Sequence, residues 1–97
     1  MLGIDNRIHF VATRPMGDVA QCLFDPLTNV TDTLVMDGMS PYLGRTPTAI
    51  YRERIDFANR QYSRKNTDGH IGDMSASFDQ LGEVAVEFLL KNYRPTT

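Results

Sequence analysis

Residues 8–36, IHFVATRPMGDVAQCLFDPLTNVTDTLVM, decide the first half of the fold. The stretch contains short runs rich in Val, Thr, Ile and Phe, separated by residues that favour turns. Strands are therefore predicted over 8–13, 19–24 and 30–36, with turns at 15–18 and 25–29. Because connections this short join antiparallel neighbours, the strands are predicted to form a three-stranded antiparallel meander.

A helix is predicted over 46–65. A loop with two glycines and a proline spans 37–46, and Thr46 followed by Pro47 is typical of a helix start. Apolar residues then recur at helical spacing, at Tyr51, Ile55, Ala58 and Tyr62. The segment ends near Lys65, before the turn-forming residues 66–69.

A second helix is predicted to begin after Ser77. Ser77 and Gln80 match a capping box, in which each side chain bonds the backbone N–H of the other residue. Apolar residues follow on one face up to Pro95, where the helix must have ended. The predicted fold is α+β: a three-stranded antiparallel meander followed by two helices packed on one face of the sheet.

Composition narrows the class of protein. The chain has 97 residues, 41% of them hydrophobic and 23% charged, with a formal net charge of −2. A chain of this size supports one core, so 1–97 is predicted to be a single domain. Cys22 is the one cysteine, which favours a reducing, cytoplasmic setting. The sequence contains neither a signal-peptide pattern nor an apolar run near the ~20 residues that span a bilayer, so no membrane partner is expected.

The charges are sorted by segment. Residues 1–44 have a net charge of −3, residues 45–65 of +4, and residues 66–97 of −3. The small net charge of the chain is therefore the result of opposing surfaces, and it gives no direct indication of a partner.

An acidic row is the first candidate binding surface. Asp79, Glu83 and Glu87 follow one another at a spacing of four residues, which on a helix places their carboxylates roughly 6 Å apart. This spacing is close to the step between phosphates along a nucleic-acid strand, so the row could act as a decoy for a basic groove. Asp73 and Asp32 are predicted to extend the surface. The alternative is a solvated helix face with acids near its N-terminus, where the helix dipole favours them.

A basic row on the segment 46–65 is the second candidate. Arginines on a helix can neutralise phosphates, and nearby tyrosines can stack on bases. Asp56 lies within the row and would repel phosphate. The residues of this alternative nucleic-acid-binding surface are Arg52, Arg54, Arg60, Arg64 and Lys65.

No catalytic residue, metal site or cofactor is predicted. His70 lies between Asp68 and Asp73, but three ligands at this spacing match neither a structural zinc site nor a calcium loop. Cys22 is interpreted as a small buried hydrophobe. A nucleophilic pair of Cys22 with His9 on the neighbouring strand would lack a third residue to orient it.

These observations predict a non-enzymatic binding protein that acts by steric or electrostatic occlusion. Its expected partner is a host protein with a basic, nucleic-acid-binding surface, by analogy of size and charge pattern with phage inhibitors such as anti-CRISPR and anti-restriction proteins. One alternative is a small DNA- or RNA-binding regulator that uses 46–65 as a homodimer. Another is a structural subunit of a larger assembly.

Overall fold

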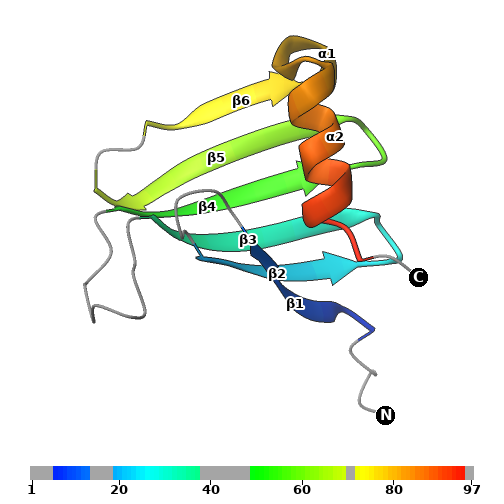
Figure 1. The fold of residues 1–97 in the computed structure, drawn as a ribbon, viewed down its shortest axis with the longest axis horizontal. Helices are drawn as coiled ribbons and strands as arrows, with labels where there is room; N and C mark the ends of the chain where they lie inside the picture. Colours follow the sequence, from blue (N-terminus) through cyan, green and yellow to red (C-terminus); the bar gives the residue numbers. More distant parts are fainter. Residues whose placement is uncertain (1–5, 14–18, 38–48, 70–71, 96–97) are drawn as a thin grey trace.

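The computed structural model describes residues 6–13, 19–37, 49–69 and 72–95. These residues form a six-stranded sheet in which the strands lie in chain order, each antiparallel to the next (Figure 1). Two helices follow the last strand, and the longer one lies across one face of the sheet (Figure 1). The elements are β1 (Ile8–Thr13), β2 (Val19–Asp25), β3 (Val30–Asp37), β4 (Ala49–Asp56), β5 (Gln61–Asp68), β6 (Met74–Ser77), α1 (Phe78–Leu81) and α2 (Glu83–Asn92).

The prediction of three strands and two packed helices is wrong, because the segment predicted as the first helix is the hairpin β4–β5. The spacing of four residues from Tyr51 to Ile55 fits one face of a helix. It also fits one side of a strand, where residues an even number apart point the same way. Glu53 lies between them on the same side and is buried, which hid the alternation from sequence analysis. The predicted helix start at Thr46 and Pro47 lies outside the described residues.

The turn of this hairpin is held by Asp56. Its carboxylate accepts hydrogen bonds from the backbone N–H of Asn59 at 3.0 Å and from the Asn59 side chain at 2.9 Å. These bonds lower the pKa of Asp56, because they stabilise the charged form. Arg60 ends the turn with a φ of +55°, the left-handed conformation that a tight turn needs and a helix does not.

The sheet has two different faces, because side chains alternate along each strand. The face under α2 holds most of the hydrophobic core, which includes Val35 and Ile55, both with no exposed surface, and side chains of α1 and α2. The opposite side is named the open face, since it has no helix among the described residues. By register the open face includes His9, Val11, Gln21, Leu23, Asp25, Val30, Asp32, Leu34, Met36, Ile50, Arg52, Arg54, Asp56, Gln61, Ser63, Lys65 and Ser75.

The C-terminal helical segment begins as predicted and then breaks. The Ser77 side chain accepts from the N–H of Gln80, and the Gln80 side chain accepts from the N–H of Ser77, so the capping box is confirmed. Gly82 then separates α1 from α2, with a φ of +92° and a ψ of 161°. This backbone conformation is essentially restricted to glycine.

Replacement of Gly82 by alanine is expected to lower the free energy of unfolding by about 1–3 kcal/mol. No heavy atom lies within 4 Å of the position a Cβ would take, so backbone strain and not a clash is the cause. Urea denaturation measures the change. Gly72→Ala is the matched control, because Gly72 has the same open space and a φ outside the left-handed region. Equal losses in the two variants would contradict this account.

Candidate functional site

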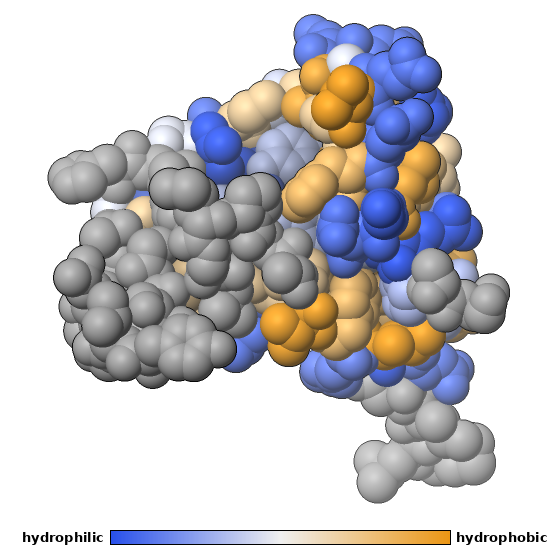
Figure 2. Space-filling view, viewed as in Figure 1, coloured by the Kyte–Doolittle hydropathy of each residue, from blue (hydrophilic) through white to orange (hydrophobic). Residues whose placement is uncertain are grey.

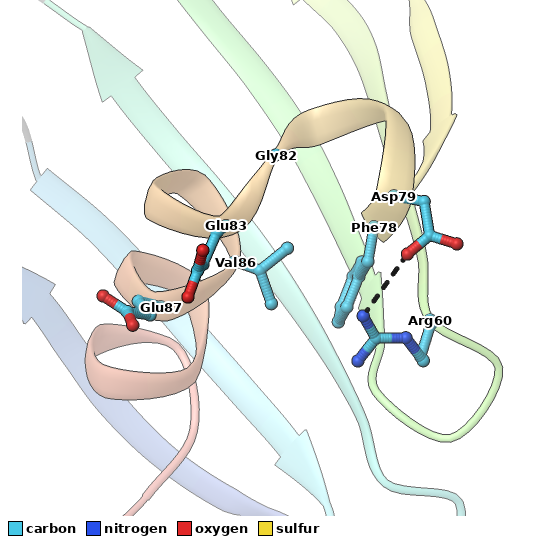
Figure 3. Close-up of a pocket in the computed structure, with 7 residues that line it drawn as sticks. All are labelled: Arg60, Phe78, Asp79, Gly82, Glu83, Val86 and Glu87. Carbon is cyan, nitrogen blue, oxygen red and sulfur yellow. Dashed lines mark ion pairs between the residues drawn. The ribbon is translucent and has the colours of Figure 1, made fainter.

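The three residues of the predicted acidic row line one groove, although they do not share one helix. Asp79 belongs to α1, whereas Glu83 and Glu87 belong to α2 and retain the spacing of one helical turn. The break at Gly82 therefore removes the continuous row. We name the groove the acidic groove (Figure 3). Its volume is about 430 Å³, and it is lined by Arg60, Phe78, Asp79, Gly82, Glu83, Val86 and Glu87.

Arg60 lies within the acidic groove and offsets part of its charge. Its guanidinium is 3.7 Å from Asp79 Oδ1 and lies over the Phe78 ring, 5.2 Å from the centroid (Figure 3). Both charged side chains are more than half exposed, so this ion pair contributes little to stability. Three carboxylates against one guanidinium leave a surplus of two negative charges, at Glu83 and Glu87.

The other two predicted acids lie elsewhere. Asp32 is on the open face, where its Oδ1 is 3.5 Å from a guanidinium nitrogen of Arg54 on the neighbouring strand. Asp73 precedes β6 and accepts a hydrogen bond of 2.8 Å from the backbone N–H of Asn66. Neither residue lines the acidic groove. The positions of Asp32 and Asp73 away from the acidic groove could not be read from the sequence, because they depend on which strands pair.

A second groove lies on the other flank of α2, between the helix and strands β4 to β6, and it was not predicted. Its volume is about 640 Å³, within the range of ligand and anchor-residue pockets. Val84, which is 83% exposed, lies at its edge. We name it the apolar groove; it is lined by Glu53, Tyr62, Arg64, Met74, Leu81, Val84, Ala85, Phe88, Leu89 and Tyr93.

The apolar groove includes a buried polar cluster around Glu53, which is 4% exposed. The Thr33 hydroxyl donates to Glu53 Oε1 at 3.4 Å, and the Tyr62 hydroxyl donates to Oε2. Burial and the neighbouring carboxylate of Glu53 raise the pKa of Tyr62, so its phenol keeps its proton and remains a donor. Arg64 faces Glu53 in the register of β4 and β5, and its Nε donates to the Gly72 carbonyl at 3.1 Å.

The basic residues divide between the two sides of the sheet. Arg52, Arg54 and Lys65 lie on the open face, where Arg52 and Lys65 are directly opposite each other. Arg60 and Arg64 lie on the side of α2. We name the open-face site, about 330 Å³ in volume, the basic concavity; it is lined by Leu23, Asp32, Thr33, Arg52, Glu53, Arg54, Ser63 and Lys65.

The structure places the candidate chemical groups apart. His9 is opposite Leu23 in the β1–β2 register, so His9 and Cys22 point to opposite faces of the sheet. Cys22 is buried in the core, as predicted. His70 lies outside the described residues, and the described residues contain no group of three or more His, Cys, Asp or Glu side chains that could hold a metal ion.

Comparison with protein-family models, curated proteins and solved structures finds no match. Within the part of the chain that the structure describes, no helix has the length and apolar character needed to cross a membrane. Three surfaces of the described residues are the candidate binding sites: the acidic groove, the apolar groove and the basic concavity.

Proposed function

We propose that this chain is a non-enzymatic binding protein that docks the outer side of α2 against a basic surface of a partner protein. The observation that supports this most is the position of two grooves on one helix, with the acidic groove on one flank of α2 and the apolar groove on the other. In Figure 2, apolar and strongly hydrophilic residues lie side by side where the helices are.

This arrangement has the components of a protein interface. Interfaces combine an apolar centre, which contributes most of the affinity, with a charged rim, which contributes specificity and association rate. Here Val84 and Leu90, which are 83% and 41% exposed, provide apolar contact, and Glu83 and Glu87 provide the charge. A partner with an apolar side chain flanked by lysines or arginines is complementary to both.

The proposed partner is a protein whose basic surface binds nucleic acid. Glu83 and Glu87 are separated by one helical turn, roughly 6 Å, and so present charge at a phosphate-like spacing. Occupation of such a surface would block nucleic acid, which is the mode of action of phage inhibitors that imitate DNA. A cytoplasmic setting is part of the proposal, since Cys22 is the one cysteine of the chain.

A nucleic-acid interface on a helix over 46–65 is not proposed, because residues 49–56 and 61–68 form two strands joined by a turn. The basic residues of that segment point to both sides of the sheet, so they do not form one continuous row.

Reversal of the two α2 carboxylates tests the proposal. The variant E83K/E87K is expected to weaken partner binding at least about tenfold, because two attractive contacts become repulsive. Capture of a partner from host lysate, with and without nuclease, identifies the complex, and titration with the purified partner gives the affinity. Asp68→Lys is the control, since it reverses an exposed carboxylate outside both grooves. Unchanged affinity of E83K/E87K would overturn the proposal.

A further inference from the structure

The basic concavity contains two cations that face each other without an acid between them in the sheet register. Arg52 on β4 is directly opposite Lys65 on β5, and both side chains are exposed. Like charges in this position repel, and an anion placed between them would relieve the repulsion. Arg54 differs, because Asp32 lies 3.5 Å from it. The surplus of positive charge on this surface is therefore at Arg52 and Lys65.

The chain itself carries a surface of matching charge. In the acidic groove Arg60 is close to Asp79, so the surplus negative charge is at Glu83 and Glu87. Two acids separated by one helical turn thus match two cations on neighbouring strands. Apolar side chains are also available next to both surfaces. Leu90 is exposed on α2, three residues after Glu87, while partly exposed Leu23 lines the concavity and partly exposed Leu34 lies opposite Arg52.

A nucleic-acid strand matches the basic concavity less well than a helix with two carboxylates. On the open face, Asp32 lies opposite Arg54 on β3 and Asp56 lies two residues beyond Arg54 on β4, and both would repel a continuous row of phosphates. Proteins that bind single-stranded DNA or RNA without sequence preference also use aromatic side chains on which the bases stack. The described residues of the open face include no Phe, Tyr or Trp.

We propose that the acidic groove of one copy of this chain docks onto the basic concavity of a second copy, head to tail. The inference rests on the proposed function, because it names a second occupant for the same acidic groove. The two surfaces lie on opposite sides of the sheet, so the contact is heterologous and can repeat from copy to copy. Self-association hides the acidic groove, and a partner protein with a stronger basic surface would compete for it.

Two neutralised variants test this arrangement by sedimentation velocity at low ionic strength over a range of concentrations. The wild-type chain is expected to form dimers and larger species that dissociate as salt is raised. The variants R52Q/K65Q and E83Q/E87Q are each expected to be monomeric. Mixed in equal amounts they are expected to form a dimer that grows no further, because each keeps one of the two complementary surfaces. Lys91→Gln is the control and should associate like the wild type, since Lys91 lines neither surface.

Three results would overturn the inference. They are a wild-type chain that stays monomeric at low salt, self-association that survives both neutralised variants, and a mixture that forms no dimer. Salt-sensitive binding of a single-stranded oligonucleotide by a monomeric chain would instead assign the basic concavity to nucleic acid.

The outcome is separable from that of the proposed function. If E83K/E87K loses the host partner but the wild-type chain is monomeric, only the docking of a second copy is wrong. If the mixed dimer forms but E83K/E87K keeps its host partner, only the proposed function is wrong.

Discussion

Replacement of Phe78 by alanine is expected to lower the free energy of unfolding by about 3–5 kcal/mol. Phe78 is the first residue of α1 and is 2% exposed. Its ring packs edge-on against Phe57, with 6.1 Å between centroids, and the guanidinium of Arg60 covers it from the groove side. The side chain therefore connects the turn between β4 and β5 to the start of the helical segment.

Loss of the ring leaves a cavity between these elements. The free energy of unfolding then falls for two reasons: less apolar surface is buried on folding, and the cavity removes packing contacts. Urea denaturation of the Phe78→Ala variant measures the loss. Leu27→Ala is the control: Leu27 is 82% exposed in the turn after β2, so its change is expected to stay within about 0.5 kcal/mol. Because Phe78 also lines the acidic groove, the variant should bind its partner less well. A loss of stability below about 1 kcal/mol would show that α1 does not depend on this contact.

Stability is expected to fall above pH 10 because of Tyr62. Burial and the carboxylate of Glu53 raise the pKa of this phenol, whereas an unfolded tyrosine loses its proton near pH 10. Above that pH the unfolded chain has released a proton that the folded chain still holds. The contribution of Tyr62 to the free energy of unfolding is therefore fully present below pH 10. Above pH 10 this contribution falls by about 1.4 kcal/mol per pH unit.

The variant Tyr62→Phe separates this effect from the titration of other groups. At pH 7 it should be less stable by about 1–3 kcal/mol, since the buried carboxylate of Glu53 loses a hydrogen-bond donor. Between pH 10 and pH 11.5 it should lose stability less steeply than the wild type, because the shifted group is absent. Urea denaturation at pH 7, 10, 11 and 11.5 compares the two proteins. Parallel curves above pH 10 would exclude Tyr62 as the cause.

The elements predicted correctly from the sequence are those with local causes. The first three strands differ from the structure by at most one residue at each end, with Asp25 and Asp37 added to the second and third. Their alternation and turn residues are properties of short segments. The capping box at Ser77 is local as well, since its donors and acceptors lie within four residues.

The hairpin β4–β5 was not predictable in this way, because not every inward position of its strands holds an apolar residue. Glu53 occupies an inward position that a sequence pattern assigns to a hydrophobe. It is acceptable there because Thr33 and Tyr62, on the two neighbouring strands, supply hydrogen bonds. Strand β6 was missed for a related reason: its four residues, Met74–Ser77, are too short for a periodic signal and become a strand by pairing with β5.

The sorting of charge along the chain is a property of the sequence alone, and so is the α2 spacing that sets Glu83 and Glu87 one helical turn apart. Which charges act together was decided only by the tertiary structure. Because side chains alternate along a strand, Arg52 and Arg64 lie on opposite sides of the sheet. The turn after β4 places Arg60 in the acidic groove. The physical reason is that a binding surface is made of residues that are neighbours in space, and in a six-stranded sheet those neighbours are set by pairing between strands and not by distance along the chain.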